Sequence, residues 1–412
     1  MQTKTSNTEP KSIWNKNFIL AMLVSALSGL SNSMLSPALP IYASSLGYGT
    51  DVAGTIVAIA TFLCMFGRGL CGGWADKTSR KKILGGAFLA STVAFILFCF
   101  AKNFALLLLA KCIQGVSSGL IITVLSTVAY DAVPAALLGS GIGIYSLASS
   151  LAQCIAPSIG TALANAGQYS VLFLCSAAAS LASFAVLLIV PIQPTAKALA
   201  YAEAKKNGTY QPTGFHISNY LCKEALPAAV LLLMNGVICA AVSNYLAICG
   251  LSRGITAVAS FFTINSVVLI ISRPLLGRLA DQKPLSWLII PGYIFMALGC
   301  FLIAIAQNMV PIAIAGVFYG VGFGAAMSAA QLAAIRSVDI SRRGVANSTY
   351  YVGGDVGLTL GAYAAGALAA SVGYTVMYEI IAASSILTLL GYFIYKARHR
   401  SAAPQQSGAT AD

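Results

Sequence analysis

The chain has 412 residues, of which 58% are hydrophobic and 8% are charged. Soluble domains carry about 25% charged residues, so this composition excludes an ordinary water-soluble enzyme and predicts helices that span a membrane. The net charge of +13 would indicate nucleic-acid binding in a soluble protein. Here the basic residues lie between apolar segments, which indicates a role in orienting the chain in a lipid bilayer and no nucleic-acid partner.

Apolar stretches follow one another along the whole chain. A membrane-spanning helix needs about 20 apolar residues, and each stretch is long enough or nearly so. The sequence therefore predicts an all-α membrane protein with twelve transmembrane helices in two bundles of six. The predicted spans are 17–43, 51–73, 83–101, 104–130, 139–163 and 169–191, then 225–248, 255–277, 286–306, 309–334, 344–370 and 374–395.

Polar segments divide the chain into five parts. We expect an N-terminal tail at 1–16, a first bundle at 17–195, a central loop at 196–222, a second bundle at 223–396 and a C-terminal tail at 397–412. The apolar run after residue 16 is too long for the core of a signal peptide, so we expect it to be retained as the first span.

The basic residues predict the orientation of the chain. Almost all of them lie in the tails, in the central loop and in alternate short loops, whereas Lys102 and Arg253 lie on the other side. Because cytoplasmic loops carry the excess of Lys and Arg, we expect a multi-pass protein of the inner or plasma membrane with both termini in the cytoplasm.

The two halves of the chain repeat each other. Parallel repeats of six helices are typical of secondary transporters, so the repeat predicts pseudo-symmetric bundles. A shift of 205 residues carries Arg68 onto Arg273, Gly72 onto Gly277, Asp76 onto Asp281, Gly115 onto Gly320, Gly119 onto Gly324, Gly139 onto Gly344 and Tyr145 onto Tyr350.

A basic segment, GGWADKTSRKK, runs from Gly72 to Lys82 between the second and third spans, and a shorter copy, GRLAD, begins at Gly277. The segment resembles the signature G-x-L-A-D-R-x-G-R-K of the major facilitator superfamily. The resemblance implies a gating motif in which Asp76 joins a charge relay on the cytoplasmic side. The alternative is a loop whose only role is to hold positive charge inside. The motif residues are Gly72, Asp76, Arg80 and Lys81 with Arg68, and Gly277 and Asp281 with Arg273; the weaker copy around Asp281 is expected to matter less.

A second family motif, R-x-x-Q-G, is similar to Lys111-Cys112-Ile113-Gln114-Gly115 in the fourth span. Lys111 lies about 10 Å into the membrane, where a charge is costly. It either extends its amine to the outer surface or serves as a cavity cation or a participant in proton coupling.

Asp355 is the acidic residue that we expect to carry the proton. It lies twelve residues after Arg343, which corresponds to about 18 Å along the helix and to the middle of the bilayer core. A deep carboxylate can take up and release a proton as its solvation changes. The alternative is a structural role, in which Asp355 bonds to neighbouring hydroxyl groups or pairs with Lys111.

The fifth span contains an approximate copy of a motif associated with antiporters of this family, G-x8-G-x3-G-P-x2-G-G. Gly143, Pro157 and Gly160 match it, whereas Ala152, Ala156 and Thr161 replace three of its glycines. Small residues also allow ordinary close packing of helices, so the pattern favours export without establishing it.

In this family, helices 1, 4, 7 and 10 line the cavity, which implies a set of polar cavity residues. The alternative for each is a hydrogen bond between helices. The candidates are Asn32, Ser36, Gln114, Asn235, Asn244 and Tyr319.

The sequence predicts no metal site, no cofactor and no enzyme activity. The ten cysteines are scattered, the two histidines are peripheral, and no glycine-rich nucleotide loop occurs. We expect a monomeric, proton-coupled antiporter that exports small organic compounds by alternating access. An importer or facilitator of a polar metabolite is the alternative, and a receptor on a transporter scaffold is a third possibility.

Overall fold

The structure is a computed structural model that describes residues 12–48, 55–56, 59–69, 79–190, 192, 199, 203, 207, 220–255, 257–258 and 260–401. Ten of its helices are long and apolar enough to cross a membrane, and Ile59–Gly69 is a shorter apolar helix. The prediction of an all-α membrane fold is therefore confirmed.

The helices of the first half begin and end close to the predicted spans. Where a helix begins after a loop, an asparagine caps it in two cases: the side chains of Asn15 and Asn103 accept hydrogen bonds from free N–H groups of the first turn. The elements are α1 (Lys16–Ser45), the short helix Ile59–Gly69, α3 (Arg80–Phe100), α4 (Phe104–Asp131), α5 (Leu138–Asn165) and α6 (Tyr169–Ile189).

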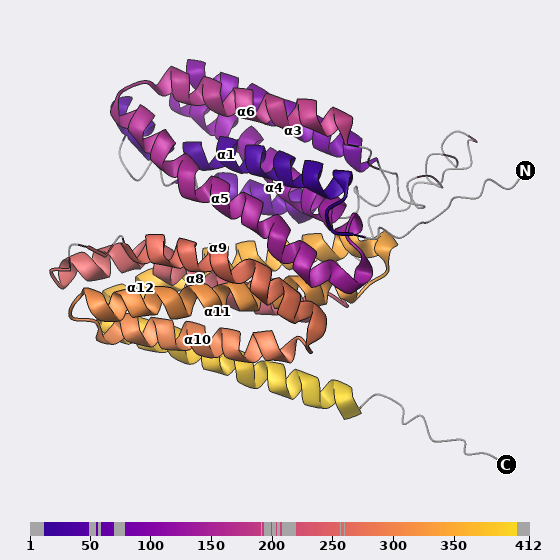
Figure 1. The fold of residues 1–412 in the computed structure, drawn as a ribbon. Helices are drawn as coiled ribbons and strands as arrows, with labels where there is room; N and C mark the ends of the chain where they lie inside the picture. The colour runs from indigo at the N-terminus through magenta and orange to yellow at the C-terminus, as the bar shows by residue number, and fades with distance from the viewer. Residues whose placement is uncertain are drawn as a thin grey trace, which may run out of the picture.

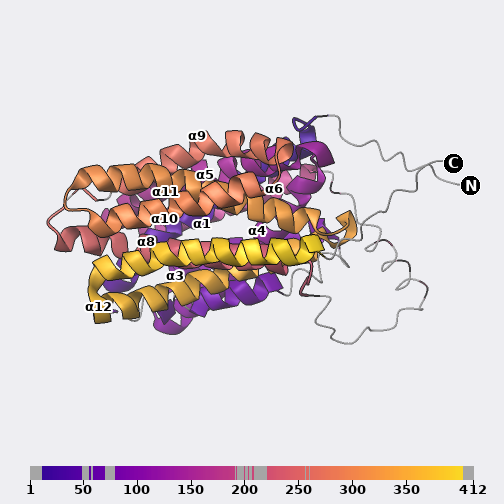
Figure 2. The same ribbon diagram turned by 90° about the horizontal axis from the view of Figure 1, so that it is seen from below.

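The second half has the same succession of helices. Its elements are α8 (Leu226–Ser252), α9 (Ser260–Gln282), α10 (Ser286–Ile305), α11 (Met309–Arg336) and α12 (Arg343–Ser401). α12 covers two predicted spans. Gly373 inside it has a φ of 82°, which only glycine adopts without strain. This glycine divides α12 into two helices that run back along each other (Figure 2). The ten long helices become twelve predicted spans if α12 counts as two spans and Ile59–Gly69 belongs to one more.

The helices form two groups, one with α1 and α3–α6 and the other with α8–α12 (Figure 1). α1 begins and α12 ends at the same end of the molecule. The outer faces of the groups are apolar: Leu89, Val93 and Ile96 of α3 are all exposed. Exposed side chains of this kind match a lipid environment, so the chain is a multi-pass membrane protein.

The sequence repeat is also a repeat of contacts. A Cβ atom on Gly115 of α4 would lie 2.6 Å from the carbonyl oxygen of Ala60 in the short helix. At the equivalent place, a Cβ atom on Gly320 of α11 would lie 3.0 Å from the side chain of Asn265 in α9. Both partners are related by the shift of 205 residues. One turn later the pairs Gly119–Cys64 and Gly324–Leu269 repeat the arrangement. The residue boundaries of the two bundles stay a prediction.

Candidate functional site

A cavity of about 470 Å³ lies between the two groups of helices. This volume is in the range of pockets that hold small organic molecules. Side chains from α1, the short helix, α4 and α5 line one side, and side chains from α8, α9, α11 and α12 line the other. Its charged and amide-bearing lining includes Asn32, Arg68, Gln153, Arg273, Gln331 and Asp355.

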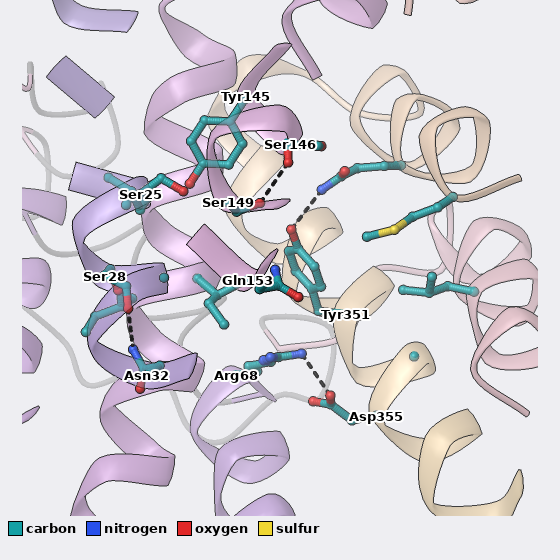
Figure 3. Close-up of a pocket in the computed structure, with 18 of the residues that line it drawn as sticks. Ser25, Ser28, Asn32, Arg68, Tyr145, Ser146, Ser149, Gln153, Tyr351 and Asp355 are labelled. Carbon is teal, nitrogen blue, oxygen red and sulfur yellow. Dashed lines mark hydrogen bonds and ion pairs between the residues drawn. The ribbon is translucent and has the colours of Figure 1, made fainter. Parts of the chain in front are cut away.

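Arg68 and Asp355 form an ion pair across this cavity (Figure 3). The distance from Nη1 of Arg68 to Oδ1 of Asp355 is 2.8 Å, and the side chains are 12% and 9% exposed. The guanidinium carbon of Arg68 also lies 5.2 Å from the ring centroid of Tyr351, one turn earlier on α12. The pair therefore joins the short helix of the first group to α12 of the second.

The pair is joined by a single hydrogen bond. Among the described residues, Oδ2 of Asp355 and Nε of Arg68 are buried without a partner. A bidentate arrangement of arginine and carboxylate is stronger than a single contact. Each charge therefore retains a polar atom that a ligand or a proton can engage. The alternative that Asp355 pairs with Lys111 is wrong, since Arg68 takes that place.

Arg273, the repeat partner of Arg68, lines the same cavity from α9. It is 8% exposed, and its Nη1 donates to the carbonyl oxygen of Ser146 in α5 at 2.7 Å. Gly143 permits this approach, because a Cβ atom there would lie 2.5 Å from the carbonyl oxygen of Arg273. The shift of 205 residues carries Gly143 onto Ser348, and the hydroxyl of Ser348 donates to the carbonyl oxygen of Arg68. The structure thus places both arginines that the sequence analysis grouped with the gating motif in the cavity between the groups.

Lys111 lies next to the cavity and belongs to a polar network. Its Nζ donates to Oε1 of Gln114 at 2.8 Å, and Gln114 donates to Oδ1 of Asn32, which lines the cavity. Ser118 also donates to Oδ1 of Asn32, at 2.7 Å. The amine of Lys111 is therefore half-buried and bonded toward the protein interior, although Lys111 is not among the described lining residues. This geometry argues against an amine that extends to the outer surface.

Asp281 of α9 connects the two groups of helices at the end of the molecule where α1 begins and α12 ends. We call this end the closed end. Its two carboxylate oxygens accept hydrogen bonds from the backbone N–H groups of Gly139 and Ser140, each at 2.7 Å. These are free N–H groups at the beginning of α5, where a negative charge is also favoured by the helix dipole. Arg336 lies 3.3 Å from Oδ1 of Asp281. These contacts give Asp281 a role in joining the two groups, whereas the expectation that it matters less than Asp76 stays a prediction, since Asp76 lies outside the described residues.

A second cluster joins the groups at the closed end. Asp131, at the end of α4, pairs with Arg80 of α3 and, at 3.1 Å, with Arg343 of α12. The side-chain amide of Asn347 is fully buried and donates to the carbonyl oxygen of Thr123 and to the hydroxyls of Ser126 and Thr127. Sequence reasoning missed Asp131 and Asn347. The signal for Asp131 was available, because it is an acidic residue at the basic end of a predicted span.

The remaining motif residues have different positions. Lys81 donates to the carbonyl oxygens of Leu188 and Val190 at the end of α6, so it stabilises its own group. Gly277 packs against α5, where a Cβ atom would lie 2.6 Å from the carbonyl oxygen of Gly139. Gly72 and Asp76 lie outside the described residues.

The antiporter-like residues occupy two faces of α5. Gly143 faces α9 of the other group, as described above, and Gly160 packs against the carbonyl oxygen of Met34 in α1. Pro157 lies inside α5 between them. α5 therefore uses one small residue toward the second group and another toward its own.

Among the six candidate cavity residues, Asn32 is the one that lines the cavity within the described part of the chain. Gln114 is buried behind it. Asn235 and Tyr319 are buried, and their side-chain polar atoms have no partner among the described residues. Ser36 and Asn244 are exposed, and neither is among the described residues that line the cavity.

The chain is similar to known transporters over nearly its whole length. The sequence pattern of the Major Facilitator Superfamily matches residues 21–339 and 262–411. Multidrug resistance protein MdtG of Escherichia coli O9:H4 (strain HS) is 23% identical over 408 residues, which cover 96% of this chain and 97% of the relative. The human organic anion transporter MFSD10 superposes with a TM-score of 0.74 at 13% identity and covers 91% of this chain and 98% of its own. FucP, a transporter of the superfamily in the outward conformation, has a TM-score of 0.72 at 15% identity and covers 92% of this chain and 98% of its own. With its two groups of helices around one cavity, this chain is a membrane transporter, not an enzyme, and it belongs to the Major Facilitator Superfamily.

Proposed function

We propose that the protein is a monomeric, proton-coupled transporter of the inner or plasma membrane that exports small organic compounds by alternating access. The observation that carries this proposal is the Arg68–Asp355 ion pair, which crosses the cavity at the depth where a substrate would bind. The similarity to a multidrug resistance protein and the antiporter-like residues of α5 support export. The distribution of basic residues supports cytoplasmic termini, so the closed end would face the cytoplasm.

In this mechanism the two groups of helices rock about the central cavity. Opening the closed end requires the separation of Asp281 from the beginning of α5 and of Asp131 from Arg343. Protonation of Asp355 removes its charge and with it the ion pair to Arg68. A proton at the cavity therefore changes the free energy of the contacts between the groups, which is the requirement for coupling.

Proton-coupled uptake is a second candidate, and the same pair favours it for some substrates. If protonation of Asp355 frees Arg68 to bind a group of the substrate, proton and substrate bind in the same state of the protein. Such positive linkage is the pattern of cotransport, whereas exchange requires that the two compete. Lys111 and its bonds to Gln114 offer a second group that could carry the proton.

The test replaces Asp355 in purified protein reconstituted into liposomes with an imposed pH gradient. A screen of dyes and small organic compounds first identifies a substrate. Asp355→Asn is expected to abolish uphill transport, while substrate binding and downhill exchange persist. Glu379→Gln is the matched control, because Glu379 is an exposed acidic residue that follows Gly373 in α12 and is not among the described residues that line the cavity. Uphill accumulation by the Asn variant with unchanged pH dependence would show that Asp355 is not the proton carrier. Proton release on substrate binding supports export by exchange, and proton uptake supports the second candidate.

A further inference from the structure

The described residues that line the cavity carry an excess of positive charge. Arg68 and Arg273 contribute two cations and Asp355 contributes one anion. Arg68 is paired with Asp355, whereas Arg273 has no ion pair among the described residues and donates only to a backbone carbonyl oxygen, that of Ser146. Arginine cannot relieve this by losing its proton in a protein. One cavity cation is therefore left without a counter-charge in the part of the chain that the structure describes.

A buried cation without a counter-ion is unstable unless another group compensates it. A neutral carbonyl oxygen compensates part of the charge. An anionic ligand would compensate the rest, and planar guanidinium groups bind carboxylate, phosphate and phosphonate oxygens in pairs of hydrogen bonds. The two arginines occupy equivalent positions in the two halves, so they approach the cavity from opposite groups of helices.

The rest of the cavity lining offers one further hydrogen-bond donor for an anionic group and an apolar surface. Gln331 donates to the hydroxyl of Tyr351 at 3.0 Å, and a hydroxyl that accepts one hydrogen bond retains its own hydrogen for a ligand oxygen. The apolar part of the lining, formed by Ile121, Ile122, Leu125, Leu232, Phe323 and Met327, offers a surface for a hydrophobic body. The lining thus combines a cationic region with an apolar wall.

We propose that the cavity binds amphipathic organic anions, whose carboxylate, phosphate or phosphonate group is held by Arg273 and by Arg68 in competition with Asp355. This inference rests on the proposed transport through this cavity and names the charge of the substrate. An anion that takes Arg68 from Asp355 favours protonation of that carboxylate, so the inference favours the linkage of the second candidate, proton-coupled uptake. Asp355 occupies Arg68 while the cavity is empty, and the anion takes its place.

Cys239 provides a direct test, because it is a native thiol that lines the cavity. In full-length protein whose other cysteines are replaced, it is labelled with two methanethiosulfonate reagents of similar size, the anionic sulfonatoethyl and the cationic trimethylammonium-ethyl compound. Each labelling rate is divided by the rate with a free thiol in solution. The corrected ratio of anionic to cationic labelling is expected to exceed one. It should fall by about tenfold in Arg273→Gln and rise in Asp355→Asn, because each variant changes the charge of the cavity by one unit.

A binding measurement on the same protein completes the test. Phenylphosphonate, its neutral dimethyl ester and phenyltrimethylammonium share one ring and differ in charge. At millimolar concentration, only phenylphosphonate is expected to slow the labelling of Cys239 by a neutral maleimide, and Arg273→Gln should remove this protection while Arg273→Lys retains part of it.

Three results would overturn the inference: a corrected ratio that favours the cation, a ratio that neither variant changes, or protection by phenylphosphonate no greater than by the other two compounds. All these measurements are made without a pH gradient. A failure here therefore differs from a failure of the proposed proton coupling, which would appear as uphill transport that persists in Asp355→Asn with unchanged pH dependence.

Discussion

Asp281→Asn is expected to loosen the closed end. In the wild-type protein the carboxylate of Asp281 accepts hydrogen bonds from the N–H groups of Gly139 and Ser140 in α5, at 2.7 Å each. Asparagine has one acceptor oxygen, so one of these bonds is lost, and the remaining bond no longer involves a charge. Its NH2 group would instead face a backbone N–H group, and neither of them can accept.

The size of the effect follows from these contacts. A hydrogen bond to a charged group contributes about 1.5–3 kcal/mol and a neutral bond about 1 kcal/mol. A negative charge at the beginning of a helix contributes about 0.3–1 kcal/mol. When the groups separate, water replaces part of these interactions in either variant. The net loss of stability of the closed end is therefore about 2 kcal/mol, which corresponds to a population shift of about 30-fold toward the open arrangement.

The assay uses a thiol placed in the cavity, as Leu125→Cys, in protein without other cysteines. A hydrophilic reagent is applied in oriented vesicles from the side of the closed end, and the labelling rate should rise by about 30-fold in Asp281→Asn. Asp339→Asn is the control, because Asp339 is exposed and its side chain makes no capping hydrogen bond. Equal rates in wild type and Asp281→Asn, or an equal rise in the control, would refute the assignment of Asp281 as a contact that holds the groups together.

Three further predictions concern packing, the buried amide and the membrane lysine. Gly357→Ala should lower the melting temperature in detergent, because a methyl group would collide with the carbonyl oxygen of Leu233. Gly86→Ala should raise it, since the space around Gly86 is open and alanine favours a helix by about 1 kcal/mol; the opposite order would contradict the packing argument. Asn347→Leu should raise labelling from the closed end, because three hydrogen bonds to α4 are lost, and an unchanged rate would mean that they do not hold the groups together. Lys111→Arg should retain transport in vesicles and Lys111→Gln should lose it; full activity of the Gln variant would exclude a need for charge there.

The amino-acid sequence alone determined which segments form membrane-spanning helices. A crossing requires a run of apolar residues, and this requirement is local, so the predicted span 83–101 differs little from α3 at Arg80–Phe100. The repeat was also visible in the sequence, because Gly115 and Gly320 are small for the same reason: each faces a neighbouring helix at close range. α12 corresponds to two predicted spans, which Gly373 separates into two helices.

The partners of the charged residues were decided only by the tertiary structure. Sequence analysis identified Asp355 but considered Lys111 as its partner, whereas the structure pairs it with Arg68, 287 residues away along the chain. It placed Asp281 in a weak copy of a motif, whereas the structure sets its carboxylate against the beginning of α5. Which side chains meet depends on how each helix is rotated about its axis and how closely it approaches its neighbours. These quantities are set by packing between distant segments, and no local pattern of hydrophobicity records them.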